Sequence, residues 1–491
     1  MHRKGSKWLK NLALRVINMY KIASKQLNFS DFNQPLGLTM NPNNRWIKKA
    51  ELIPWDEIEK EYAKLFKGKN GQVAKPLRLA LGALLIQIEY SYSDEETALQ
   101  IQENPYLQFF CGMGGYEDKA PFDSSLMVHF RKRLTPEVLG KINDMIIANS
   151  QEESPSQKDD DHKNDPPKNR GTLIVDATCA PSNIKYPQDT ELLNEAREKL
   201  EKMIDVLHDP ADGKKPRTYP QKARKDYLVL ARKKKRSAKE IRKATRKQLQ
   251  YIKRDLRYID DMLQQGKALA RKCAVQLQTI RKLYDQQLYM YESKTHKVPE
   301  RIVNLRQPYI RPIVRGKAKA PVEFGIKLDI SVVDGFVRLE KQSFDAYNES
   351  EFLEEEIENY RERYGFYPER VLADKIYRNR NNINFCKGHG IRLSGPALGR
   401  PKKDVVVDKQ QEYVDSCERV EVERKFSLAK RKFGMGLIRT YLEETSKTVI
   451  ALSILALNLS RVFCALFFEY VIHCLHLRFF ADQHENVAFV Q

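Results

Sequence analysis

The spacing of apolar residues changes along the chain, and each change predicts a different kind of element. Between residues 77 and 135 apolar positions recur every three to four residues in short stretches separated by turn-forming residues, which is the pattern of small stacked helices. We therefore expect an all-α N-terminal domain over residues 33–148, preceded by a basic extension over residues 1–32.

Strand-like patterns appear from residue 171 onwards. Thr172–Val175 is a short β-favouring run that ends at Asp176, and a second such run ends at Asp374. Residues 322–344 resemble two strands joined by an Asp334-Gly335 turn, with helical patterns at 379–387 and 412–432 and a short strand at 391–393. The order of elements predicts a mixed α/β domain over 171–480, followed by a tail at 481–491.

Two segments interrupt this organisation. Residues 149–170 are rich in charge and proline and lack large apolar side chains from residue 151 onwards, so they are predicted to be a linker. Residues 190–300 are charged and helical in pattern with few glycines, which predicts a helical arm inserted into the α/β domain after its first strand.

One apolar stretch, Thr448–Phe468, is close to the length of about 20 residues that spans a membrane. Asn458, Ser460 and Arg461 lie near its middle, where a charge is costly in lipid. We therefore favour a buried core helix over a transmembrane helix.

The charge of the chain is concentrated in the predicted arm. The chain has 86 Lys and Arg against 65 Asp and Glu, a formal charge of +21, and residues 214–254 hold 18 basic and only two acidic residues. Nucleic acid is the expected partner of such a surface, although a soluble coiled coil has a similar composition. Candidate DNA contacts are two basic runs, Arg131, Lys132 and Arg133 in the N-terminal domain and Lys233, Lys234, Lys235 and Arg236 in the arm.

The cysteines argue against a secreted protein. Seven cysteines are scattered without a Cys-x-x-Cys pair, which excludes a zinc ribbon and a disulfide framework and suits a reducing cytosol. The N-terminus lacks the continuous apolar run of a signal peptide, so export is not expected.

Three carboxylates form the candidate chemistry. Asp176 and Asp374 each follow a strand, and Glu423 lies on a helix where Arg419 and Lys430 fall within roughly 40° of it. Apolar Val422, Phe426 and Phe433 lie on or beside that face, so it should pack inward. The cluster fits either a buried ion-pair network or a carboxylate site for two Mg²⁺ ions that act on a phosphodiester. In the second case Arg419 and Lys430 are further candidate DNA contacts, which would hold the phosphate backbone.

At these residues the chain resembles the DDE transposases of bacterial insertion sequences, in particular the insertion-sequence-five superfamily. The resemblance begins near residue 33 and includes LIVDATCAPSNIKYPQDTELLNEAREKL around Asp176 and VLADKIYRNRNNINFCKGHGIRLSGPALGRP around Asp374. Arg419, Glu423 and Lys430 match the Arg-x3-Glu-x6-Lys spacing of the family. The family's tyrosine three residues before the arginine is replaced by Ser416, and Tyr413 one turn earlier is a candidate substitute.

The resemblance implies an RNase H-like core in which Asp176, Asp374 and Glu423 are catalytic and hold two Mg²⁺ ions, with Mn²⁺ as a substitute. It also implies double-stranded DNA partners, both the terminal inverted repeats of the element and target DNA, a homodimer in a synaptic complex, and a cytoplasmic, nucleoid-associated location in a bacterium. Two alternatives remain at this stage. One is a decayed or non-joining nuclease that only cuts or binds DNA, and the other is a basic protein at a membrane surface.

Overall fold

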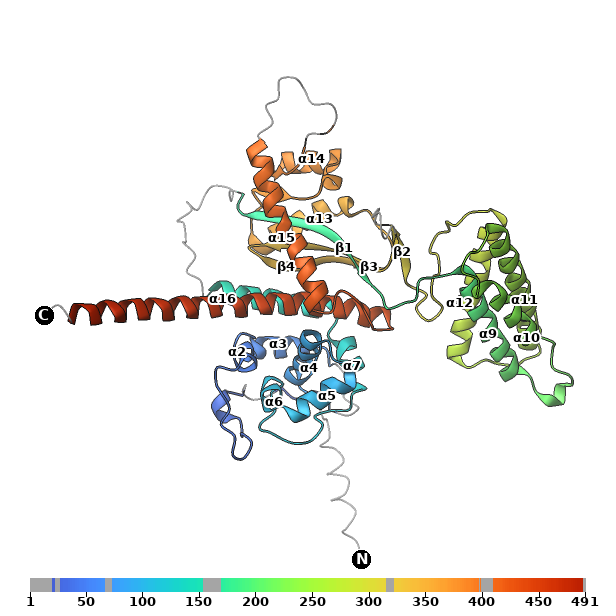
Figure 1. The fold of residues 1–491 in the computed structure, drawn as a ribbon, viewed down its shortest axis with the longest axis horizontal. Coiled ribbons are helices and arrows are strands. Elements are labelled where there is room, and N and C mark those ends of the chain that lie inside the picture. Colours follow the sequence, from blue (N-terminus) through green and yellow to red (C-terminus); the bar gives the residue numbers. More distant parts are fainter. Residues whose placement is uncertain are drawn as a thin grey trace, which may run out of the picture.

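The structure is a computed structural model that describes residues 20–22, 27–66, 73–152, 169–314, 322–396, 398 and 409–488, with only the backbone of 467–488. Its parts are a helical N-terminal domain, a mixed sheet with flanking helices, and a separate group of four helices (Figure 1). The sheet and helices agree with the predicted α/β class.

The N-terminal domain packs around one buried helix. Helix α4 (Leu77–Tyr90) packs against α3 (Trp55–Ala63), α5 (Asp94–Glu103), α6 (Pro105–Phe110) and α7 (Leu126–Arg133). The domain also contains α2 (Arg45–Glu51), which packs on α6, and α8 (Pro136–Glu152), which packs on α3. Eleven of the 14 residues of α4 are buried, so it is apolar nearly all round. Tyr20 and Phe32 belong to this core, so the packed part of the domain begins before the predicted boundary at residue 33, and α8 continues to Glu152, past the predicted end at 148. Most of the predicted basic extension (1–19 and 23–26) and most of the predicted linker (153–168) lie outside the described residues.

The sheet is built around two long strands. Strand β1 (Thr172–Pro181) pairs antiparallel with β3 (Val322–Val333) and parallel with β5 (Arg370–Leu372). The remaining strands are β2 (Arg311–Val314) and β4 (Phe336–Ser343), which both pair with β3, and β6 (Arg392–Leu393), which pairs with β5. Helices α13 (Leu353–Tyr364) and α14 (Arg380–Gly388) follow the hairpin and β5, and α15 (Lys409–Lys432) crosses the sheet (Figure 1).

The predicted hairpin turn forms where the sequence places it. Asp334 and Gly335 have φ values of 49° and 73°, as a two-residue turn between antiparallel strands requires. A Cβ on Gly335 would lie 2.5 Å from the guanidinium of Arg461, which donates a hydrogen bond to the Asp334 carbonyl. The turn therefore needs glycine both for its backbone conformation and for the approach of Arg461.

The apolar stretch near the C-terminus is a core helix. Helix α16 (Glu443–Ala488) runs between the N-terminal domain and the sheet (Figure 1), where Ile450, Leu452 and Leu455 are fully buried. Its segment Glu443–Leu466 is the one candidate membrane span in the described part of the chain, and 61% of its most apolar window is buried inside the protein. The preference for a core helix is thus confirmed for residues 448–462. The prediction of a separate tail from residue 481 is wrong for residues 481–488, because α16 continues to Ala488.

Four helices stand between β1 and β2 and form a body to one side of the sheet (Figure 1). They are α9 (Asp189–Leu207), α10 (Pro220–Ala231), α11 (Ala238–Gln264) and α12 (Arg271–Glu292), and we call residues 189–305 the arm. Buried side chains of α9, α11 and α12, with Ile302 and Leu305, form a hydrophobic cluster separate from the one under the sheet.

Candidate active site

The register of the sheet places Asp176 beside Asp374. Thr172 pairs with Arg370 and Ile174 with Leu372, so the same parallel offset puts Asp176 level with Asp374, two residues beyond the last pair. The sequence predicted that Asp176 ends its strand, and this is wrong. Strand β1 continues to Pro181 by pairing with β3 alone. Asp176 lies where the neighbouring strand β5 has ended, which leaves room beside its side chain.

Helix α15 brings Glu423 to the same face of the sheet. Val422, Phe426 and Ala429 are buried beneath the helix and hold it against β1 and β3, as the predicted inward face requires. Arg419 lies 3.3 Å from Glu423, with the side chain of Glu423 half exposed. Lys430 donates a hydrogen bond of 2.8 Å to the hydroxyl of Thr178, which points to the same side of β1 as Asp176.

Asp176 is influenced electrostatically by the other two carboxylates. Burial raises the pKa of Asp176 to about 6, and the charges of Asp374 and Glu423 raise it as well. A hydrogen bond from the Ala177 amide and the charge of Arg419 act in the opposite direction. The site therefore concentrates negative charge that Arg419 compensates only in part, as expected where cations or phosphate chemistry are to be accommodated.

The donor set fits a hard divalent cation, although the site is not closed around one. All three side chains offer carboxylate oxygens, the ligands that Mg²⁺ prefers. Within the described residues no group of three or more His, Cys, Asp or Glu side chains lies close enough to form a metal site. Asp374 is exposed and caps the following turn through the Lys375 amide, and Glu423 points towards Arg419.

An ion cluster that the sequence did not reveal fixes the start of α15. Asp415 is buried and accepts two hydrogen bonds from Arg392 on β6, at 2.5 and 2.8 Å, with Arg370 on β5 3.6 Å away. These bonds hold the pKa of Asp415 below its usual range. Arg370 also pairs with Glu418, so two arginines on adjacent strands anchor the helix that carries Glu423.

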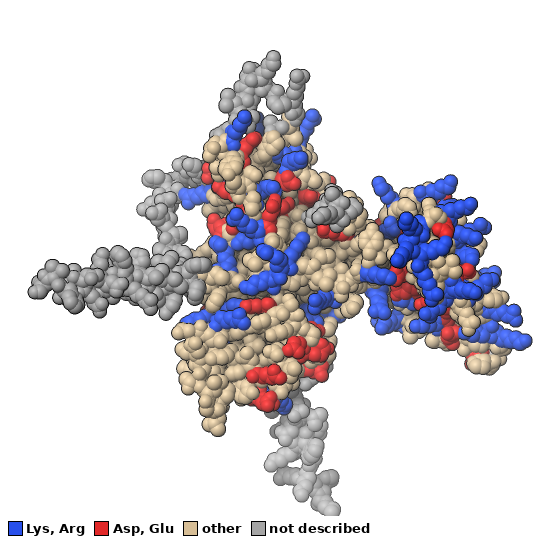
Figure 2. Space-filling model, viewed as in Figure 1, with Lys and Arg blue, Asp and Glu red and all other residues tan. Residues whose placement is uncertain are grey.

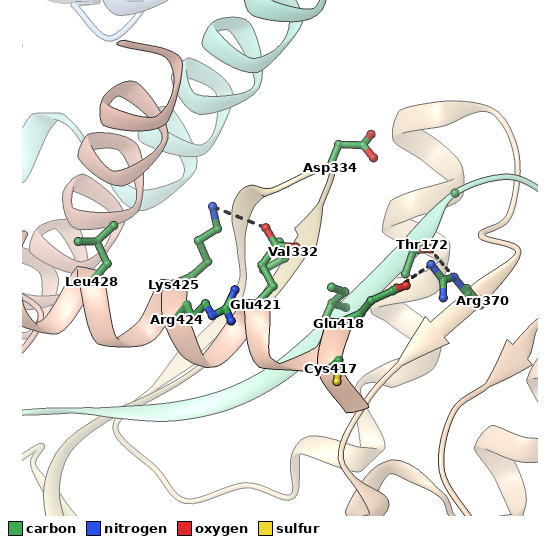
Figure 3. A pocket seen from close by; sticks show the side chains of 12 residues that line it. Thr172, Val332, Asp334, Arg370, Cys417, Glu418, Glu421, Arg424, Lys425 and Leu428 are labelled. Atoms are coloured by element: carbon green, nitrogen blue, oxygen red, sulfur yellow. Dashed lines mark hydrogen bonds and ion pairs between the residues drawn. The ribbon is translucent and has the colours of Figure 1, made fainter. Parts of the chain in front are cut away.

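A cleft of about 620 Å³ lies along α15 at the beginning of β1 (Figure 3). Arg370, Arg424 and Lys425 line it together with Glu418, Glu421 and Asp334, so charges of both signs face the space. Burial lowers the pKa of Lys425, whose ammonium lies 3.8 Å from Glu421. None of the three candidate catalytic carboxylates lines this cleft.

The basic run of α7 serves the structure of the N-terminal domain. Arg131 is 5% exposed and makes two hydrogen bonds to the carboxylate of Asp94, at 2.5 and 2.9 Å. Lys132 pairs with Glu444 of α16, and Arg133 lies over the ring of Phe66. The prediction that Arg131 contacts DNA is therefore wrong, because its guanidinium is a buried structural group. Lys132 and Arg133 stay predictions.

The basic run of the arm forms the turn between α10 and α11. Lys233 pairs with Glu240, and Arg236 donates hydrogen bonds to the Ala231 carbonyl and to Gln188. Lys234 and Lys235 are exposed and have no ion pair within the described part of the chain. Of the four predicted contacts, these two are thus the most accessible.

Comparison with known proteins gives two family matches. Residues 37–133 match the family described as "Transposase domain (DUF772)", and residues 371–460 match "Transposase DDE domain". The second match includes Asp374, Glu423 and the buried part of α16.

A curated relative, "Uncharacterized protein ORF8 in nfe locus" of Rhizobium meliloti, is 28% identical over 169 residues, which are 34% of this chain and 77% of that protein. No solved structure matches. Both family matches name a transposase. The two matches and the relative together support the resemblance of this chain to the DDE transposases of insertion sequences.

Proposed function

We propose that the protein cuts DNA at the terminal inverted repeats of an insertion sequence and joins the resulting 3′-hydroxyls to target DNA. Asp176, Asp374 and Glu423 would be its catalytic carboxylates. The observation that supports this most directly is the convergence of the three residues, from β1, the end of β5 and α15, which brings Asp374 and Glu423 within electrostatic range of Asp176. In a purely structural ion-pair network, we would expect each of the three carboxylates to pair with a cation.

The order of strands favours an RNase H-like core for this chemistry. The series β4, β3, β1, β5, β6 is antiparallel for its first three strands and parallel for the last three. Asp176 then lies on the first strand of the chain and Asp374 directly after its parallel neighbour. Functional groups gather at such positions, where strands of an α/β sheet end.

Each residue has a definite role in the proposal. The three carboxylates would hold two Mg²⁺ ions or their Mn²⁺ substitutes, which when bound supply activation of the attacking oxygen and neutralisation of the phosphate charge. Lys430, held beside Asp176 by Thr178, is positioned to bind a non-bridging phosphate oxygen. Arg419 balances Glu423 and is available to the DNA backbone. The synapsis of two DNA ends would require a homodimer, and we place the protein in the cytoplasm with the nucleoid.

The experiment uses purified protein, Mg²⁺ or Mn²⁺, and duplexes that carry the repeats flanking its gene. The parent should nick and join, whereas Asp176→Asn and Glu423→Gln should lose at least a thousandfold of both, about 4 kcal/mol of transition-state stabilisation. Glu421→Gln is the matched control, because Glu421 lies on the same helix and faces the cleft. Nicking without joining would favour the nuclease alternative. Binding without cleavage in either ion would reduce the protein to a DNA-binding relative.

A further inference from the structure

One face of α11 carries a straight line of basic side chains, which we call the α11 stripe. Exposed positions recur every three to four residues and lie within about 40° of a single line along the helix. They are Lys239, Lys243, Arg246, Gln250, Lys253 and Arg257. At 1.5 Å per residue the stripe is about 27 Å long.

The core of the arm fixes the direction in which the stripe points. Ile252 and Ile259 lie on the opposite side of α11 and pack in the arm's hydrophobic cluster, largely against α9. Rotation of the helix would expose these side chains. The stripe is therefore held outward, and Figure 2 shows basic side chains crowding the surface of the arm.

The stripe lacks the acidic partners that some exposed lysines have on other helices. Lys48 pairs with Glu51 at 3.1 Å, and Lys282 pairs with Glu300. No ion pair engages any of the five stripe cations within the described residues. Like charges four residues apart on a helix repel one another, so this arrangement is destabilising unless an external anion lies along it.

We propose that the α11 stripe binds the phosphate backbone of duplex DNA outside the active site. This inference rests on the proposed function, since it assigns the DNA of the same reaction to a second surface. The stripe's length corresponds to about eight phosphate spacings of 3.4 Å along one strand. An anionic membrane is a poorer occupant, because a membrane-surface helix inserts its apolar face and here that face is buried within the arm.

The root of the arm connects the stripe to the active site. Residues after β1 run directly into the arm, and they bond to the loop after α15: the Ile438 amide donates to the Pro181 carbonyl and the Asn183 amide to the Ile438 carbonyl, at 2.8 and 2.9 Å. Asp189, at the start of α9, accepts hydrogen bonds from Gln287 and Arg301 and so joins both ends of the arm. DNA on the stripe is thus positioned relative to the elements that carry Asp176 and Glu423.

The test compares two triple variants of the full-length protein that lose the same charge. K239Q/K243Q/R246Q removes half of the stripe. The control, K202Q/R271Q/K272Q, removes exposed cations of α9 and of the start of α12. The end of α12, not its start, lies beside the mutated half of the stripe, because the Arg242 guanidinium donates a hydrogen bond to the Tyr291 carbonyl. DNA affinity is measured against salt for terminal-repeat duplexes of increasing length.

The stripe variant should lose affinity only for duplexes long enough to reach the arm. For these the slope of log K against log salt should fall in magnitude by about 2.7, the loss of three phosphate contacts, while the control keeps the parental slope. Nicking of the shortest duplex should be unchanged in both variants, and its absence in the parent would instead count against the proposed function. Equal slopes in the two variants would overturn the inference. So would a loss of binding to phosphatidylserine vesicles with DNA binding intact, which would assign the stripe to a membrane.

Discussion

At the scale of single residues, Asp329 of β3 is the clearest source of pH dependence. Its side chain is fully buried on the face of the sheet opposite Asp176, near the buried carboxyl of Glu356. Burial raises the pKa of Asp329 to about 7, and the charge of Lys327 offsets this only in part. Because the folded-state pKa lies above the ordinary value of 3.8, the protonated carboxyl is favoured in the folded protein.

We predict that Asp329→Asn makes stability less dependent on pH. The contribution of Asp329 is complete below about pH 4 and is lost as the pH rises towards about 7. At alkaline pH the variant should be more stable than the parent, by at most about 4 kcal/mol, and the difference should vanish in acid. Urea unfolding across this range measures it, with exposed Asp345→Asn as the control. Parallel stability curves for Asp329→Asn and the parent would mean that water reaches the carboxyl.

The same scale shows which residues a sequence can assign. The position of Glu423 beside Arg419 was predictable because helical periodicity alone places both on one face, whereas its catalytic role stays a prediction. Arg131 was assigned wrongly, since periodicity cannot tell that Asp94, from another helix, would neutralise it in the core. The roles of Asp329 and Asp415 could not be predicted from the residues next to them in sequence. Asp415 depends on its ion pair with Arg392, and Asp329 on burial among apolar side chains from other segments.

At the scale of elements, the position of α15 depends on its ionic anchor. We predict that Asp415→Asn weakens the attachment of the helix to β5 and β6, because it leaves Arg392 beside a neutral amide. Because Arg392 is 42% exposed and solvent screens the pair, we expect the loss of stability to be about 1 kcal/mol. Hydrogen exchange at the start of α15 should accelerate, and DNA cleavage should fall severalfold with no change in DNA affinity.

Glu412→Gln provides the matched control for the anchor, since Glu412 is exposed one turn earlier on the same helix. It should leave both measurements unchanged. A parental cleavage rate in Asp415→Asn, despite faster exchange, would separate the anchor from catalysis.

The lengths of elements were predictable where they depend on local sequence. The helix expected at 412–432 forms over Lys409–Lys432, and the Asp334-Gly335 turn is in place. Strand β1 is longer than its β-favouring run, because residues 177–181 are held by pairing with Gly325–Asp329, nearly 150 residues later. Strand β2 was missed because it is four residues long and includes a proline, which is tolerated at an edge.

At the scale of the whole molecule, the largest hydrophobic cluster cuts across the predicted domains. The N-terminal helices, one face of the sheet and α16 share a single hydrophobic cluster, whereas the arm has its own. The sequence could delimit the arm by its charge. It could not show that the apolar stretch near the C-terminus joins the N-terminal domain to the sheet, since an apolar helix does not reveal its neighbours.

Asn458 of α16 links the N-terminal domain to the sheet through hydrogen bonds, so we predict that these two parts unfold cooperatively. It accepts a hydrogen bond from the Val337 amide at 2.9 Å and donates to the Val337 carbonyl and to Asn143 of α8, both at 2.7 Å. Asn458→Leu leaves buried polar groups of β4 and α8 unpaired, at a cost of about 2 to 4 kcal/mol. The N-terminal domain and the sheet should therefore lose stability together, in one calorimetric transition.

The arm should unfold in a separate transition that Asn458→Leu leaves in place, because no residue of its hydrophobic cluster belongs to the cluster that contains α16. Ile259→Ala, at a fully buried position of α11, identifies that transition by lowering its midpoint alone, with a loss of about 2 to 5 kcal/mol. If each variant shifts both transitions, the arm and the body form one cooperative unit. Independent transitions would mean that the arm can respond to bound DNA without disturbing the core that holds Asp176 and Glu423 in place.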